Sequence, residues 1–213
     1  MPNWQSERQR VALDLAALGI PLLPSHHPMG VDPASLVGHR FVCSCGEATC
    51  PTPARHLPGA LTRQDATTDP ERLARWWRGP AGQANLVTVA GWAFDVIELS
   101  FNAPAEQVAA WLRAHDLEAG PVIDTGATTR FLVQVGAPVP CYAPLRSGWL
   151  AKLKHGELVL LPPSRSISGR ELVWRTGPSG IALPDGEELY RVLLRLPTVS
   201  ELATWARPKL RKR

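Results

Sequence analysis

The hydrophobic pattern of the chain centres on residues 94–100, Phe-Asp-Val-Ile-Glu-Leu-Ser, which predict a buried strand in the middle of a sheet. Gly91 precedes this run, and Pro104 follows it. Successive side chains of a strand point to opposite faces of the sheet. Asp95 and Glu98 are therefore expected on opposite faces, unless a β-bulge turns the Asp95 side chain over.

Periodic apolar positions predict helices and strands along the rest of the chain, and their mixture indicates an α+β fold. Helical spacing with capping residues predicts helices at 6–18, 68–79, 105–115, 187–196 and 200–205. Short apolar runs predict strands at 20–23, 85–90, 121–124, 131–135, 157–161 and 171–174. The strands on either side of Gly91 are expected to pair as a hairpin. Residues 25–40 are rich in His, Pro and Gly, so they are expected to form a surface loop.

Length and composition fit one compact domain, because 45% of the 213 residues are hydrophobic. We expect this domain at residues 1–196, followed by a helix and a basic tail at 197–213. The net charge of the chain is +4, and the excess of basic residues is concentrated in the tail, at Arg207, Lys209, Arg211, Lys212 and Arg213. Such a tail suits an anionic partner, and it could equally be plain solvated surface. The sequence has neither a membrane-length apolar run nor a signal-peptide pattern, so we expect a cytoplasmic protein without a membrane partner.

A cluster of metal-ligand residues lies in a turn-rich insert at about residues 40–60. Its spacing is C-x-C-x4-C-x5-H, formed by Cys43, Cys45, Cys50 and His56. Three thiolates and an imidazole can close a tetrahedral shell around zinc, and four protein ligands make such a site structural. The alternative is a set of unliganded thiols in a loop, but this hydrophilic stretch has no core to bury them. Cys141 stands apart and is expected to be a packed thiol.

Four ordered stretches of the chain resemble a known family. They are residues 12–24, the cysteine–histidine insert at 43–56, residues 66–85, and the late strand with its Pro-Pro-Ser turn at 156–174. Together they resemble the bifunctional DNA primase/polymerase N-terminal domain of the archaeo-eukaryotic primase superfamily. The resemblance implies an α+β domain with a mixed sheet, an RNA-recognition-like half that carries the active site, helices packed on it, and a zinc-binding loop.

The resemblance also implies nucleotidyl transfer by two divalent metals, Mg²⁺ or Mn²⁺, held by acidic side chains. The paired acids of the family fall on Glu98 and Ser100, its nucleotide-contacting histidine falls on Phe131, and its later acid falls among residues 151–155, where no acid occurs. Glu98, with Asp95, is therefore expected to be the vestige of a catalytic site. Magnesium or manganese would be a cofactor only if that site still functions.

The eroded site on an intact scaffold predicts a primase/polymerase-like protein that acts by binding DNA, RNA, a nucleotide or a protein partner. Candidate phosphate contacts, each of which could equally be solvated surface, are Arg130, Lys152, Lys154, Arg165 and Arg170. One alternative is an active manganese- or magnesium-dependent primase/polymerase that uses Glu98 and Asp95. A second alternative is a zinc-stabilised protein-interaction module.

Overall fold

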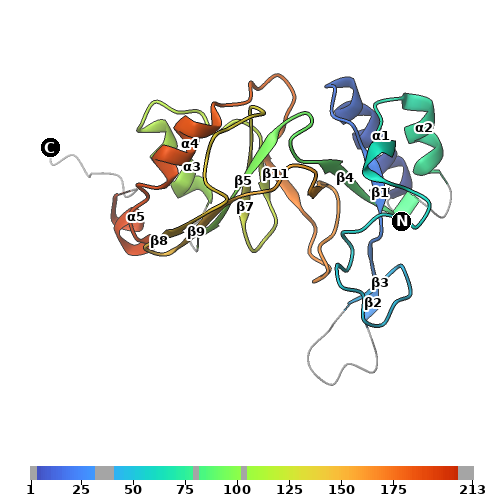
Figure 1. Ribbon diagram of the computed structural model, residues 1–213. Helices are drawn as coiled ribbons and strands as arrows, with labels where there is room; N and C mark the ends of the chain where they lie inside the picture. The colour runs from blue at the N-terminus through green and yellow to red at the C-terminus, as the bar shows by residue number, and fades with distance from the viewer. Residues whose placement is uncertain (1–3, 32–40, 79–81, 102–104, 206–213) are drawn as a thin grey trace, which may run out of the picture.

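The computed structural model has two lobes and a small ribbon (Figure 1). It contains five α-helices among the residues that it describes, which are 4–31, 41–78, 82–101 and 105–205. Every strand pair in these ranges is antiparallel, whereas the family resemblance implies a mixed sheet. The basic tail lies beyond the described ranges, so its predicted role stays a prediction. No helix in these ranges is long and apolar enough to cross a membrane.

The N-terminal lobe is built on a three-stranded sheet, here called the small sheet. Its order is β1 (Leu23–Ser25), β4 (Asn85–Val89) and β10 (Leu158–Leu161). The helices α1 (Trp4–Ala17) and α2 (Pro70–Trp76) pack on this sheet and enclose a first hydrophobic core. The predicted start of α2 is confirmed, because the Asp69 carboxylate caps it by accepting a hydrogen bond from the backbone N–H of Glu71 at 2.9 Å.

The second lobe is built on a six-stranded sheet, here called the large sheet. Its order is β11 (Val173–Thr176), β6 (Val122–Asp124), β7 (Thr129–Val133), β5 (Asp95–Phe101), β9 (Gly148–Lys152) and β8 (Tyr142–Leu145). One face is covered by α3 (Ala105–Arg113), α4 (Gly186–Leu193) and α5 (Val199–Trp205), which enclose a second hydrophobic core (Figure 1). The interior position of β5 confirms the central strand predicted from residues 94–100.

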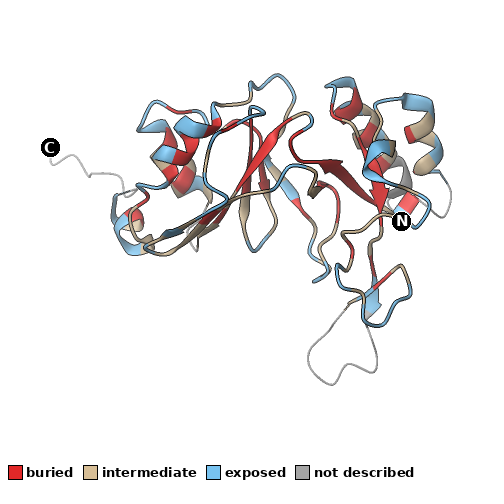
Figure 2. Ribbon diagram, in the orientation of Figure 1, coloured by how far each residue is buried: buried red, intermediate tan, exposed pale blue. Residues whose placement is uncertain are grey.

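The strand β5 contributes to both cores because its side chains alternate. Ile97 and Leu99 point into the second core, whereas Val96 points the other way into the first core. Figure 2 shows β4 and β5 as largely buried elements of the molecule. The two lobes therefore share hydrophobic packing at this strand, and each face of β5 has a different environment.

The predicted hairpin between residues 85–90 and 94–100 is wrong. Strand β4 pairs with β1 and β10 of the small sheet, whereas β5 pairs with β7 and β9 of the large sheet. The turn at Gly91, with φ +82°, carries the chain from one sheet into the other. Both strands already have a partner on each side, so neither has a free edge for the other.

Three further differences concern short elements. A hairpin of β8 and β9 was not predicted, because Pro144 and Gly148 weaken the strand pattern there. The expected loop at 25–40 contains β2 (Pro28–Val31), which pairs with β3 (Phe41–Cys43) as a two-stranded ribbon, and residues 32–40 are not among those described. A 3₁₀ turn, η1 (Arg63–Asp65), precedes α2.

Cys141 is exposed rather than packed, because it lies just before the edge strand β8.

Candidate functional site

A cleft of about 760 Å³ opens where the large sheet meets the small sheet and the cysteine-rich insert. We call it the Glu98 cleft. Its floor includes Glu98 of β5 and Arg130 of β7, and its walls include residues 51–55, the 125–128 turn and the 166–172 loop. Residues from distant parts of the sequence thus surround the acid that the sequence singled out.

Within this cleft the Glu98 carboxylate is paired with the Arg130 guanidinium. The two residues lie directly opposite each other on β5 and β7, and Arg130 Nε lies 2.8 Å from Glu98 Oε2. Only 13% of the Glu98 side chain and 9% of the Arg130 side chain are exposed. Arg130, predicted as a phosphate contact, therefore already neutralises the one acid on the cleft floor.

The strand neighbours of Glu98 supply no second acid. Ala151 of β9 lies directly opposite it on the other side, and Ser100 lies two residues along β5. Phe131, to which the family histidine was assigned, pairs with Ile97 and is buried in the second core. An imidazole at position 131 would thus point away from Glu98, because the residue that faces Glu98 from β7 is Arg130.

Asp95 lies on the opposite face of β5, as its spacing predicts. Its Oδ2 accepts hydrogen bonds from the backbone N–H groups of Gly136 at 2.9 Å and Ala137 at 3.1 Å. The ammonium of Lys152 lies 2.9 Å from the same oxygen and donates to the Ala137 carbonyl. No register shift interrupts the pairing of β5, so no bulge brings Asp95 to the Glu98 face. Asp95 and Lys152 anchor a turn and lie outside the lining of the cleft.

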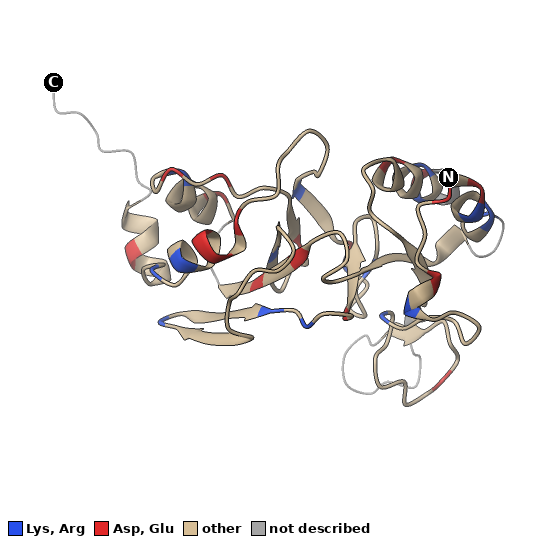
Figure 3. Cartoon of the chain, turned by 45° about the horizontal axis from the view of Figure 1, so that its top comes forward, with Lys and Arg blue, Asp and Glu red and all other residues tan. Residues whose placement is uncertain are grey.

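The remaining predicted basic residues have different surroundings. Arg170 lines the cleft, is exposed, and donates a hydrogen bond to the Gly126 carbonyl at 2.7 Å. Arg165 is half-buried, with its backbone bonded to Asn85, and Lys154 is exposed in the turn before β10. Arg55, which sequence reasoning did not select, also lines the cleft. Figure 3 shows basic and acidic residues interspersed over both lobes.

The turn between β6 and β7 is held by its own side chains. Asp124 Oδ1 accepts from the Gly126 N–H at 2.6 Å, and the Thr125 hydroxyl accepts from the Thr128 N–H at 2.9 Å. Gly126, with φ +81°, lies so close to Arg170 that a Cβ there would be 2.0 Å from the arginine Cδ. The turn therefore presents small residues and hydroxyls at the cleft in a fixed arrangement.

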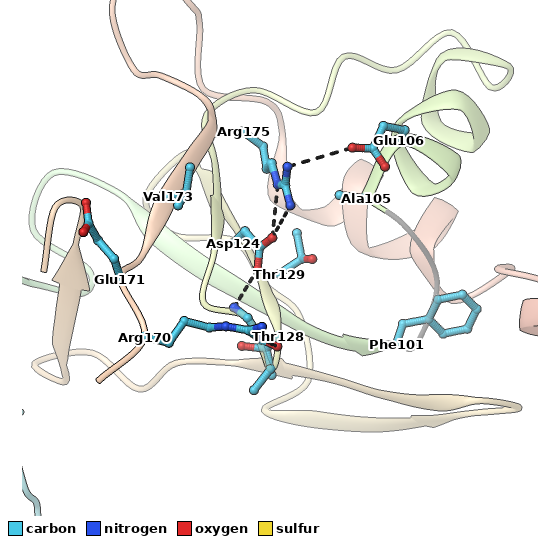
Figure 4. A pocket seen from close by; sticks show the side chains of 12 residues that line it. Phe101, Ala105, Glu106, Asp124, Thr128, Thr129, Arg170, Glu171, Val173 and Arg175 are labelled. Carbon is cyan, nitrogen blue, oxygen red and sulfur yellow. Dashed lines mark hydrogen bonds and ion pairs between the residues drawn. The ribbon is translucent and has the colours of Figure 1, made fainter. Parts of the chain in front are cut away.

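A second pocket of about 670 Å³ lies on the other side of this turn (Figure 4). Arg175 Nη2 lies 2.6 Å from Asp124 Oδ2, and Arg175 Nη1 lies 3.9 Å from Glu106. Burial alone would raise the pKa of Asp124, but hydrogen bonds from Arg175 and the Gly126 N–H outweigh it and lower the pKa. The Arg175 pKa is raised in turn by Asp124. The charges in this pocket largely satisfy one another.

The predicted metal ligands meet in space. The ligand atoms of Cys43, Cys45, Cys50 and His56 all lie within 4.8 Å of one another. His56 Nε2 lies 3.3 Å from the sulfurs of both Cys43 and Cys50. A tetrahedral zinc site with ordinary bond lengths has sulfur–nitrogen separations of about 3.5 Å. This donor set therefore fits zinc, as the sequence spacing predicts.

The thiols of this cluster influence one another strongly. Burial favours the protonated form of Cys43, but hydrogen bonds from the Ala54 and Cys45 N–H groups and from His56 lower its pKa to about 7. Burial and the neighbouring thiols raise the pKa of Cys50 to about 11. Several thiolates can coexist at this distance only with a cation between them, and a bound metal supplies that charge.

The metal cluster is joined to the cleft wall through Asn85, the first residue of β4. Its fully buried amide donates to the Ala54 carbonyl at 3.1 Å and to the Arg165 carbonyl at 2.8 Å, and its oxygen accepts from the Arg165 N–H at 2.9 Å. Residues 51–55 and 165–172 are thereby fixed to one strand. Sequence reasoning did not identify this role, although a lone amide opening an apolar strand is a recognisable signal.

The family model described as the N-terminal region of bifunctional DNA primase/polymerase matches residues 12–190. A search among curated proteins returned no match. The matched region includes both sheets, the metal cluster and the residues that line the Glu98 cleft, whereas α5 lies beyond it.

Proposed function

The chain belongs to the bifunctional DNA primase/polymerase N-terminal family, and from this premise we propose that it binds DNA in the Glu98 cleft without polymerising nucleotides. The observation that carries the proposal is the ion pair between Glu98 and Arg130. The same pair removes a metal ligand and leaves the cleft free of unbalanced negative charge.

Loss of catalysis follows from the chemistry of nucleotidyl transfer. The reaction needs two divalent metals that neutralise charge on the triphosphate and activate the attacking hydroxyl, and those metals need several carboxylate ligands. Here a single carboxylate is available on the cleft floor, and it is already neutralised at 2.8 Å by Arg130. Ser100 and Ala151 offer only a hydroxyl and a methyl group.

Binding is supported by the groups around the cleft. Arg55 and Arg170 line it, together with the hydroxyls of Thr125, Ser166 and Ser168. Guanidinium groups bind phosphate oxygens in a bidentate manner, and hydroxyls add further hydrogen bonds. Arg55 lies immediately before the metal ligand His56. A zinc ion bound there as a structural cofactor would therefore hold Arg55 in place.

Nucleotide incorporation on primed and unprimed templates, first with Mg²⁺ and then with Mn²⁺, tests the loss of catalysis. We expect no synthesis above background from either the wild type or the Glu98→Ala variant. Synthesis that disappears in Glu98→Ala would overturn the proposal and identify an active primase/polymerase.

Fluorescence anisotropy with a labelled single-stranded DNA oligonucleotide tests binding. We expect Arg55→Ala and Arg170→Ala each to weaken binding and to reduce the slope of log affinity against log salt by about one. Arg10→Ala is the matched control, because Arg10 is exposed on α1, pairs with Asp14 and does not line the cleft. If Arg55→Ala and Arg170→Ala bound the oligonucleotide as tightly as Arg10→Ala, this result would count against the cleft as the binding site.

A further inference from the structure

The large sheet carries an aromatic pair, an exposed tyrosine and a half-buried tryptophan, on the same face as the Glu98 cleft. Tyr142 of β8 lies opposite Ala151 of β9, which in turn lies opposite Glu98 of β5. Trp149 of β9 lies opposite Ser100 of β5. Directly opposed residues of antiparallel strands share a face, so both aromatic side chains lie on the Glu98 face.

Burial of the alternate residues confirms which face this is. Ala143, Leu145 and Leu150 of the same hairpin pack against the second core, beneath the helices. Tyr142 and Trp149 therefore point away from the helices. Tyr142 is 60% exposed, and its ring centroid lies 6.4 Å from that of Trp149 with the ring planes 33° apart.

We propose that Tyr142 and Trp149 form a stacking platform for the bases of single-stranded DNA whose phosphates bind in the Glu98 cleft. The proposal rests on the proposed function and names the form of DNA that this face would hold. Aromatic side chains stack on nucleobases with little sequence preference, and such platforms commonly accompany a positively charged groove.

The charge of this face fits a polyanion. Between the aromatic pair and the cleft lie Ala151 and Ser100, which carry no charge. The acid that follows them, Glu98, is neutralised by Arg130. Because none of the described residues along this path is an unpaired carboxylate, a phosphate backbone can cross from the aromatic pair to the arginines of the cleft without repulsion.

The dimensions fit a short single strand. Neighbouring strands of a sheet are separated by about 4.8 Å, so β8 and β7 lie about 14 Å apart across β9 and β5. A few nucleotides span this path, with a base on the aromatic pair and phosphates near Arg170 and Arg55. A duplex keeps its base faces stacked inside the helix, and a peptide lacks the regular phosphates, so single-stranded DNA is the ligand that uses both features.

The test uses the full chain and a labelled oligonucleotide of ten thymidines, beside an abasic oligonucleotide of the same length. Tyr142→Ala should bind the thymidine oligonucleotide at least about fivefold more weakly, because it loses stacking. Tyr142→Phe should bind like the wild type. Trp92→Ala is the control, because Trp92 is likewise an exposed aromatic residue, at 39%, but lies before the other end of β5, away from the aromatic pair. On the abasic oligonucleotide, wild type and Tyr142→Ala should bind equally.

Each outcome decides between the two proposals. Wild-type affinity of Tyr142→Ala for thymidine, with weakened binding by Arg170→Ala, would overturn the aromatic platform and leave cleft binding intact. Absence of binding by the wild type would overturn the proposed function itself. Tighter binding of a matching duplex or RNA strand, with the same loss in Tyr142→Ala, would overturn single-stranded DNA as the ligand. Trp149→Leu, checked for folding by urea denaturation, should reproduce the loss seen for Tyr142→Ala.

Discussion

Glu98 and Arg130 face each other across β5 and β7 and form a 2.8 Å ion pair on the floor of the main cleft. The pair occupies the place where the family resemblance puts a metal-binding carboxylate. Both side chains of the pair are more than four-fifths buried, so each buried charge needs the other to balance it. This dependence can be measured directly.

Breaking one side of the pair should destabilise the fold. We expect Arg130→Ala to lower the free energy of unfolding by about 3–5 kcal/mol, because it leaves the buried Glu98 carboxylate without a partner. The double variant Glu98→Leu with Arg130→Leu should recover most of that loss, since no buried charge remains. Urea denaturation measures both. Arg10→Ala is the control, because it breaks the exposed ion pair of Arg10 with Asp14 and should lower the free energy of unfolding by less than about 1 kcal/mol. An equal loss of stability in Arg130→Ala and Arg10→Ala would contradict the importance of the buried pair.

Removal of the metal cluster should release zinc and unfold the insert. We expect Cys45→Ser to lose bound zinc and several kcal/mol of stability, because binding energy at a structural site is folding energy. Metal analysis of the purified protein and thermal unfolding with and without chelator provide the measurements. Cys141→Ser is the matched control, because this exposed thiol lies outside the cluster. Unchanged thermal stability in chelator would argue against a structural metal.

Loss of the Asn85 amide should weaken the attachment of both cleft walls. Asn85→Ala removes the three hydrogen bonds that the fully buried amide makes to the backbones of Ala54 and Arg165. We expect a destabilisation of about 3 kcal/mol in urea denaturation. Gln134→Ala removes one exposed hydrogen bond to the Leu183 carbonyl and should cost less than about 1 kcal/mol. Similar losses in the two variants would show that Asn85 has no special role.

The pair of Asp124 and Arg175 predicts a pH dependence of stability in acid. The folded-state pKa of Asp124 is lowered, so its pairing stabilises fully above the unfolded pKa of about 3.9 and is lost as pH falls through the folded pKa. Asp124→Asn should cost at most about 1 kcal/mol at pH 7, because Arg175 is half-exposed. Below pH 4 the difference between wild type and variant should shrink. A difference that stays constant from pH 7 to pH 3 would contradict this assignment.

The sequence determined the features that depend on neighbouring residues. Period-two alternation predicted that Asp95 and Glu98 lie on opposite faces of the strand, and β5 places them so. The short spacing of the cysteines and His56 was enough to predict their meeting, because a turn-rich loop of 14 residues has few ways to arrange them. The helix cap at Asp69 also depends only on residues next to it in the sequence, and the sequence predicted it. The family resemblance, carried by ordered motifs, is confirmed by the family match over residues 12–190.

The tertiary structure alone decided which residues meet across strands. Arg130 was predicted to contact phosphate, yet it neutralises Glu98, and Lys152 instead pairs with Asp95 on the other face. The partner of a strand and its register depend on contacts between residues far apart in the chain, which local alternation does not encode. For the same reason β4 and β5 joined different sheets, and the unpredicted β8–β9 hairpin placed Tyr142 and Trp149 beside the cleft face.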